Sequence, residues 1–319
     1  MNLQLNKMLE WIKNNIANIL VGIIIIGAIN LRIVLYDDMR LSIATNDSSS
    51  YYSEVNLPLF SWESFTARRL PSYPIFFKIF EPINGYQEPK AVSYPAAPGV
   101  GTRNKALQPG FDSVALAQAI LAIFSWVFFV IILCRRLRIK ILRPIAAAMI
   151  LLFAFSPSLA EWDSVIMSES ISFSLFTILA AVSLELLFRI PQEKNKPERI
   201  TSILLVIWML LVPAWAFTRD SNANTLVILV GFFGFFLIIP RIRRETPIIW
   251  FSGILIWLVF LAYLYSITTT AANRWVWGWL DIYNHWISGN PARMKFFIDH
   301  GMPDPWTNEW VQLSGTKTY

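Results

Sequence analysis

Cysteine, histidine and charged residues are all scarce in this sequence. Its 319 residues include one cysteine, Cys134, and two histidines, His285 and His300, and only 15% of them are charged. A single cysteine cannot form an intrachain disulfide or a cysteine metal cluster, and two histidines are too few for a typical zinc site. The sequence therefore predicts neither a disulfide-stabilised protein nor a zinc protein.

Apolar residues are what the sequence has in abundance. Hydrophobic residues make up 55% of the chain and aromatic residues 15%. The mean hydropathy of +0.49 lies outside the usual range for a soluble domain. The net charge of +6 would suit nucleic acid, but the basic residues cluster in short loops between hydrophobic runs. We therefore predict an all-α membrane protein that has membrane lipids, and no nucleic acid, among its partners.

Seven hydrophobic runs are each close to the length of about 20 residues that a helix needs to cross the hydrocarbon of a membrane. Helices are expected, because isolated strands would leave backbone groups without hydrogen bonds in lipid. The first run is long and no small-x-small cleavage site follows it, so we predict a retained helix rather than a signal peptide. The runs are 15–36, 114–134, 145–160 (with Ile141 and Leu142 extending its inner end), 165–188, 200–217, 223–240 and 248–266.

Lysine and arginine are distributed unequally between the short loops, and this predicts the orientation. Every second short loop is strongly basic, whereas the loops on the opposite side carry no lysine and only one arginine, Arg219. By the positive-inside rule, the basic loops and residues 1–14 face the cytoplasm, so the long segment 37–112 and the aromatic-rich tail 267–319 lie outside. The basic loops are 135–143, 189–199 and 241–244, and the opposite loops are 161–164 and 218–222.

The segment 37–112 is the longest polar stretch within the predicted seven-helix module, which spans residues 15–266. Aromatic residues at 60–80 interleave with arginine and lysine, a pattern typical of an amphipathic helix that lies flat in the headgroup region. Residues 81–110 are rich in proline and glycine and predict an irregular loop. A loop of this length between membrane spans usually has a function.

Two short motifs in this segment have the residue types of a reaction site. The first is an acid followed four residues later by a tyrosine, and the second is an arginine and a proline followed by a tyrosine–proline pair. In this order, after one hydrophobic span and before an apolar helix, they resemble the GT-C glycosyltransferases. The similarity is greatest to bacterial members related to protein mannosyltransferases and the lipid A aminoarabinose transferase. The matching residues are Asp47 and Tyr51, then Arg69, Pro71, Tyr73 and Pro74.

The resemblance covers about residues 15–305 and has two exceptions. Ser48 stands where many members have a second acid, and Ser72 stands where a glycine usually precedes the tyrosine–proline pair. The resemblance implies transfer of a sugar from a polyprenyl-phosphate donor to an unidentified acceptor, on the outer face of a bacterial inner membrane. No cofactor is expected. Some relatives bind a divalent cation through loop acids, but no ligand spacing here requires a metal.

The roles of individual residues are expectations from the same resemblance. Asp47 would be the catalytic base or lie beside it, since a carboxylate can accept the proton of a hydroxyl. Arg68, Arg69 and Arg219 would bind the donor phosphate, since guanidinium groups pair well with phosphate. Tyr51 and Tyr73 would line the substrate cavity. The further catalytic candidates are Glu161 and Asp163, in a loop where relatives often have a functional acid, and Glu169, whose depth in a span predicts that it faces the bundle interior or a wet cavity.

Each of these residues also has an interpretation without a function. Asp47 can begin a turn, and Arg68 and Arg69 can touch lipid headgroups. Glu161 and Asp163 can be the solvated end of a helix hairpin. Structural ion pairs are predicted for Arg219 with Asp220 and for Glu185 with Arg189 one turn later. Arg32 can either snorkel to the membrane interface or pair with Asp37 or Asp38.

Two other classes of protein are alternatives to an enzyme. A non-catalytic membrane subunit with the same fold could hold a larger complex together, and the lack of an acid at Ser48 and the end of the chain at Tyr319 favour it. A transporter is less favoured, because no pair of broken helices and no internal repeat is evident.

Overall fold

The structure is a computed structural model of the chain, and it describes residues 2–36, 39–44, 47–83, 85–86, 106–107, 110–190, 198–238, 248–274, 276 and 290–300. The chain forms two compact units, Met1–Tyr265 and Ser266–Tyr319; the second contains the short helix α14 (Pro291–Asp299). Within the described ranges the protein is α-helical, apart from one antiparallel pair of two-residue strands, β1 (Ile43–Ala44) and β2 (Ala106–Leu107). The predicted all-α fold class is confirmed for this part of the chain.

Each of the seven predicted hydrophobic runs overlaps a helix. Five helices in the described part of the chain are long and apolar enough to cross a membrane, or six if the bent pair of α6 and α7 forms one span. The chain is therefore a multi-pass integral membrane protein. Helix α10 is not among these, and its predicted run ends at residues 239–240, outside the described part, so seven spans stay a prediction. The helices are α1 (Asn2–Leu35), α5 (Asp112–Arg136), α6 (Leu142–Ala154), α7 (Pro157–Ala160), α8 (Ser168–Arg189), α9 (Arg199–Ala216), α10 (Asp220–Ile238) and α12 (Ile248–Ala271).

Two helices differ from the predicted runs. The run 145–160 is not one straight helix, because α6 ends at Ala154 and Pro157 begins a second piece that is bent by 53° from the first. Proline lacks a backbone N–H, so it is favourable in the first turn of a helix but cannot continue one. Helix α1 begins at Asn2, so the polar start of the chain extends the first helix instead of preceding it.

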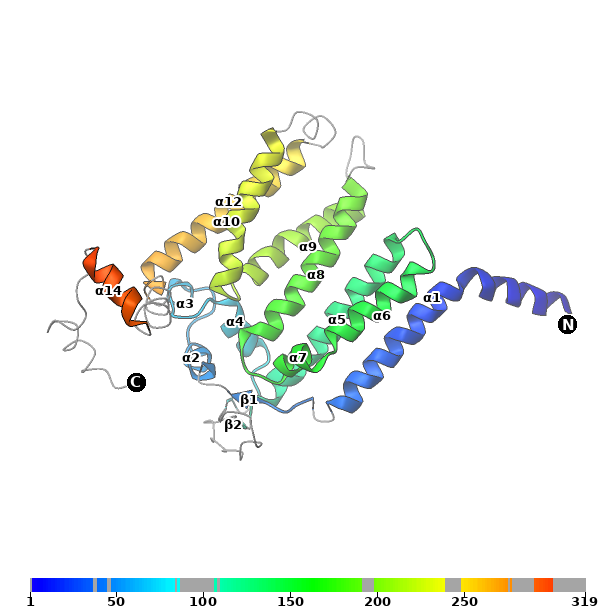
Figure 1. Cartoon of the computed structure of the whole chain (residues 1–319), viewed down its shortest axis with the longest axis horizontal. Helices are drawn as coiled ribbons and strands as arrows, with labels where there is room; N and C mark the ends of the chain where they lie inside the picture. Colours follow the sequence, from blue (N-terminus) through cyan, green and yellow to red (C-terminus); the bar gives the residue numbers. More distant parts are fainter. Residues whose placement is uncertain are drawn as a thin grey trace. The chain divides into compact units, whose positions relative to one another are not determined.

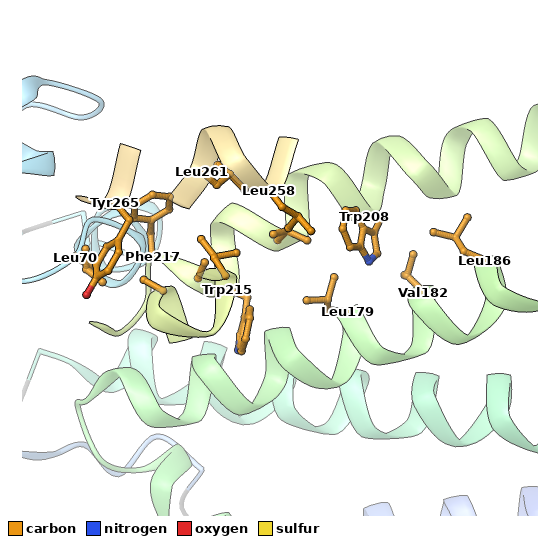
Figure 2. Close-up of a cluster of buried hydrophobic side chains, with 14 residues drawn as sticks. Leu70, Leu179, Val182, Leu186, Trp208, Trp215, Phe217, Leu258, Leu261 and Tyr265 are labelled. Atoms are coloured by element: carbon orange, nitrogen blue, oxygen red, sulfur yellow. The ribbon is translucent and has the colours of Figure 1, made fainter. Parts of the chain in front are cut away.

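The helices of the first unit pack in pairs, some of them neighbours in the sequence and two of them, α1 with α6 and α5 with α8, more distant. Helix α1 packs against α6, α6 against α5, α5 against α8, α8 against α9 and α9 against α10 (Figure 1). Buried apolar residues of α8, α9, α10 and α12 form one group, which we call the α8–α12 cluster (Figure 2). Apolar residues on the outer face of α1, such as Ile23 and Val34, are exposed, as expected of a helix that faces lipid.

The polar segment after α1 folds over one end of these helices, the end where α8 begins (Figure 1). Two backbone hydrogen bonds of 2.8 Å fasten its start to the connection before α8: Ile43 N–H donates to Ser164 O, and Ile166 N–H donates to Ile43 O. The sequence motifs are thereby held at one end of the bundle. The short helices of the segment are α2 (Ser48–Tyr52), α3 (Trp62–Phe65) and α4 (Ser72–Ile79).

The predicted single helix at 60–80 is wrong, because the structure has the two short helices α3 and α4 there. Ser61 caps the start of α3 by accepting a hydrogen bond of 3.1 Å from the Ser64 N–H. In α4, Tyr73 and Phe77 are fully buried in a second apolar group that includes residues of α5 and α8. One face of α4 therefore packs against protein and not against lipid.

Candidate functional site

Leu70 fixes the second sequence motif in place. It is 2% exposed and packs with Phe217 and Tyr265 at one end of the α8–α12 cluster (Figure 2). The backbone N–H of Ser72 donates to Phe217 O, at 3.2 Å. Because Arg69 directly precedes Leu70, this anchoring holds the backbone of Arg69 close to the end of α9.

Arg69 brings the two sequence motifs together. Its Nη2 atom lies 3.0 Å from Asp47 Oδ1, and its Nε donates to Ser50 Oγ at 2.7 Å. The guanidinium carbon lies 4.6 Å from the centre of the Tyr51 ring, within the range of a cation–π contact. The backbone N–H of Arg69 donates to Glu54 Oε1, at 2.8 Å. The predicted base and the predicted phosphate ligand are therefore direct partners.

Tyr51 connects this arginine to the start of α8. Its hydroxyl shares a hydrogen bond of 2.9 Å with Ser168 Oγ, and its ring meets the Tyr73 ring edge-on with the centres 4.9 Å apart. Tyr73 is fully buried, and its hydroxyl donates to Gln118 Oε1 at 2.6 Å. Burial raises the pKa of Tyr51 and of Tyr73. Both phenols therefore stay neutral and serve as hydrogen-bonding groups.

A second acid–arginine pair lies close to Tyr51. Arg219 Nη1 is 2.8 Å from Glu169 Oε1, and the side chains of Arg219 and Glu169 are 39% and 9% exposed. Glu169 is in the first turn of α8, and Arg219 follows the end of α9. After burial and the Ser168 hydrogen bond, the pKa of Tyr51 responds to Arg69, Glu169 and Arg219. The Arg69 guanidinium and the Glu169–Arg219 pair therefore lie close enough to Tyr51 to act on it electrostatically.

We call these residues the Tyr51 site. The Asp47 side chain is 57% exposed, so its carboxylate is open to a substrate hydroxyl. Arg69 and Arg219 offer two guanidinium groups of the kind that bind phosphate. The site thus combines an accessible proton acceptor with two cations. Its members are Asp47, Tyr51, Arg69, Ser168, Glu169 and Arg219.

Asp163 belongs to a different cluster, and its interpretation as a solvated hairpin end is wrong. It is 6% exposed, its Oδ2 lies 2.6 Å from Arg32 Nη2, and its Oδ1 accepts a hydrogen bond of 2.6 Å from Ser170. A buried, fully engaged carboxylate of this kind suits a structural ion pair. Arg32 therefore pairs with Asp163, while the predicted partners Asp37 and Asp38 lie outside the described residues.

Two further candidates lie at the surface. Arg68 and Glu161 are exposed, and for Glu161 this agrees with a solvated hairpin end. Arg219 forms its salt bridge with Glu169 of α8. The predicted local pair with Asp220 is therefore not the salt bridge that the structure shows for Arg219.

Four polar residues support the site without being predicted from the sequence. Gln118 is fully buried in α5, and its amide donates to the backbone oxygens of Asp163 and Val165, at 2.9 and 3.0 Å. A single glutamine inside an apolar run is the signal that could have revealed it. The other three, Ser50, Glu54 and Ser168, contact Arg69 or Tyr51 and have no comparable signal.

Within the described ranges, no group of three or more His, Cys, Asp and Glu side chains is arranged to hold a metal ion. Comparison with protein-family models, with curated proteins and with solved structures finds no match to this chain. A functional assignment therefore depends on the Tyr51 site and on the motifs of the sequence.

Proposed function

We propose that this chain is a glycosyltransferase that takes a sugar from a polyprenyl-phosphate donor and acts on the outer face of the membrane. The observation that carries the proposal is the ion pair of Asp47 and Arg69, 3.0 Å apart and beside Tyr51, in which the Asp47 carboxylate is exposed. In this pair a carboxylate that can accept a proton lies next to a guanidinium that can bind phosphate. The resemblance of the two motifs to GT-C enzymes supports the same function.

The proposed reaction is a direct displacement at the anomeric carbon of the sugar. The acceptor hydroxyl oxygen forms the new bond to this carbon, while the bond from the carbon to the phosphate oxygen breaks and leaves its electron pair on the phosphate. Asp47 takes the hydroxyl proton. The products are the glycosylated acceptor and the lipid phosphate, and attack opposite the leaving group inverts the anomeric configuration.

The arginines of the Tyr51 site would stabilise the departing phosphate. Hydrogen bonds between guanidinium groups and phosphate oxygens are charge-assisted and strong. Arg69 is paired with Asp47, so a phosphate that takes over this guanidinium also releases Asp47 to accept a proton. Arg219 stays bound to Glu169 and adds a second cation, and the exposed Arg68 adds a third near the lipid headgroups.

Asp47→Asn tests the proposed base. The amide keeps the shape and most of the hydrogen bonding of the carboxylate but cannot accept the proton. We expect this variant to express and purify like the parent while its transfer rate falls on the order of 10² to 10⁴. The assay uses a panel of polyprenyl-phosphate sugars that is first screened on the parent. Glu63→Gln, at an exposed acid of α3, is the matched control and should keep full activity. Equal transfer by Asp47→Asn and the parent would show that Asp47 is not the base.

One observation favours a second candidate, a non-catalytic subunit that holds a larger membrane complex together. Ser48 stands where many GT-C members have a second acid, and here its side chain is buried and donates to Ile166 O at 2.8 Å. This position therefore has a structural contact and does not present an acid to a substrate. A parent protein that is inert across the donor panel but co-purifies with a stable partner would favour this candidate.

A further inference from the structure

One buried oxygen atom in the Tyr51 site has no hydrogen-bond partner among the residues that the structure describes. It is Oε2 of Glu169, whose side chain is 9% exposed. The other carboxylate oxygen, Oε1, lies 2.8 Å from Arg219 Nη1. Buried polar atoms in native proteins are nearly always hydrogen-bonded, and a charged group that is left without a partner is especially costly. Oε2 therefore lacks the hydrogen bond that a buried carboxylate oxygen normally has.

The hydroxyl groups next to Glu169 in the sequence are engaged elsewhere. Ser168 Oγ shares its hydrogen bond with the Tyr51 hydroxyl, at 2.9 Å. Ser170 Oγ donates to Asp163 Oδ1, at 2.6 Å. A serine hydroxyl has one hydrogen to donate, so Ser170 has none left for Glu169. Ser170 therefore does not complete the hydrogen bonding of Glu169 Oε2.

The charges of the site decide which kind of donor fits. Arg219 already balances the charge of Glu169, so this carboxylate does not require a second cation. A lipid phosphate is an anion, which a carboxylate repels and which Arg69 and Arg219 attract. The group that donates a hydrogen bond to Glu169 Oε2 is therefore neutral. On a lipid-linked sugar, the neutral hydrogen-bond donors next to the phosphate are the hydroxyl groups of the sugar ring.

We propose that Glu169 Oε2 accepts a hydrogen bond from a hydroxyl group of the transferred sugar, which makes Glu169 a residue that selects the sugar. This inference rests on the proposed function, since it needs a sugar linked to a lipid phosphate in the Tyr51 site. In this arrangement Asp47 contacts the acceptor, the arginines contact the phosphate, and Glu169 contacts the sugar. The substrate class is a sugar with a free hydroxyl close to its anomeric carbon, and the matching deoxy sugar is a poor substrate.

The test compares the binding of lipid phosphates with and without a sugar to the whole chain in lipid nanodiscs. The probes are a polyprenyl phosphate and the same lipid phosphate carrying glucose, mannose, galactose or xylose. We expect the parent to bind at least one sugar-bearing lipid about tenfold or more tightly than the sugarless lipid, as one hydrogen bond to a charged group would produce. Glu169→Gln should lose most of this ratio, and Glu63→Gln should keep it. The ratio is the readout because an effect of the variant on Arg219 changes the binding of both lipids.

Deoxy sugars supply a second measurement, whose first step uses the parent alone. For the sugar that binds best, one deoxy analogue should bind the parent about tenfold more weakly than the full sugar. In Glu169→Gln the difference between this analogue and the full sugar should shrink, because a neutral amide oxygen accepts a weaker hydrogen bond than a carboxylate. Analogues that lack hydroxyl groups at other ring positions serve as controls, and Glu169→Gln should leave their ratios to the full sugar unchanged.

The results separate this inference from the proposed function. An unchanged ratio in Glu169→Gln overturns the inference even if the parent transfers sugar. A parent that binds no sugar-bearing lipid more tightly than the sugarless one also overturns it, and water then completes the hydrogen bonding of Oε2. A parent that transfers no sugar but shows the ratio, and loses it in Glu169→Gln, contradicts the transferase and supports Glu169 as a sugar-binding residue. Binding of neither kind of lipid overturns both.

Discussion

Removing one partner of the Arg32–Asp163 ion pair should destabilise the protein strongly. The two side chains are 2% and 8% exposed, and Arg32 Nη2 lies 2.6 Å from Asp163 Oδ2. Loss of one partner leaves the other charge buried without a counter-ion, which costs about 3–5 kcal/mol. Solvent does not screen this pair as it screens a surface pair, which contributes about 0–1 kcal/mol. We therefore expect Asp163→Leu, and likewise Arg32→Met, to lower the free energy of unfolding by about 3–5 kcal/mol.

The double variant should recover most of this loss. Arg32 also donates to Ala160 O at 3.1 Å and stacks over the Tyr36 ring at 3.9 Å. Its Nε and Nη1 atoms, however, are buried and have no partner in the described part of the chain, and each costs about 1–3 kcal/mol. Methionine and leucine in place of the ion pair remove these unpaired donors together with both charges. Replacement of a buried ion pair by apolar residues of similar size is often neutral or stabilising.

Reversible unfolding in mixed detergent micelles, followed by circular dichroism, would measure these free energies. The parent, the two single variants and the double variant form a cycle, whose coupling energy should exceed the loss in either single variant and be about 5 kcal/mol or more. Glu161→Gln, at an exposed acid two positions before Asp163, is the matched control and should change the free energy by less than about 0.5 kcal/mol. A loss in Asp163→Leu no larger than in this control would refute the reasoning, as would a double variant less stable than both single variants.

Two further predictions concern the orientation and the support of Tyr51. In a Cys134→Ala background, Ser53→Cys should react with a membrane-impermeant thiol reagent in intact cells, whereas Lys140→Cys should react only after permeabilisation, because the loop around Lys140 is basic. Both positions are exposed, and the opposite labelling pattern would rule out a reaction on the outer face. Tyr73→Phe should lower the free energy of unfolding by about 1–3 kcal/mol, since the buried Gln118 Oε1 loses a hydrogen bond of 2.6 Å. The same detergent unfolding would measure this, and an unchanged free energy would contradict it.

The helices could be predicted because a backbone in lipid must satisfy its own hydrogen bonds, and a helix does this within one segment. The predicted run 114–134 differs from α5 by two residues at each end, and the run 200–217 differs from α9 by one. Local ion pairs could also be predicted, since residues four apart lie on one face of a helix. The pair of Glu185 and Arg189 is confirmed, at 2.7 Å. Arg136 of α5 contacts the same carboxylate, and nothing in the local pattern indicates this third partner.

Contacts between distant segments account for what could not be predicted. Arg32 has acids five and six residues later in the sequence, yet its partner Asp163 comes from the turn that follows α7. The bend at Pro157 places Asp163 at that position. The prediction of one straight span did not include this bend, so the pair could not be predicted. In the candidate site, the order of the motifs indicates Asp47 and Arg69 separately. That they are direct partners depends on the burial of Leu70, which is a property of the folded cluster.

The two ion pairs of the Tyr51 site differ in the ease with which a ligand could separate them. Asp47 is 57% exposed, so its pair with Arg69 resembles a surface salt bridge, which contributes about 0–1 kcal/mol. Glu169 is 9% exposed, and separating it from Arg219 would leave a buried carboxylate without its counter-ion. An incoming phosphate would therefore displace Asp47 from Arg69 and leave Glu169 in place. The residue proposed to move a proton is the one that phosphate binding releases, and the residue proposed to select the sugar is the one that stays fixed.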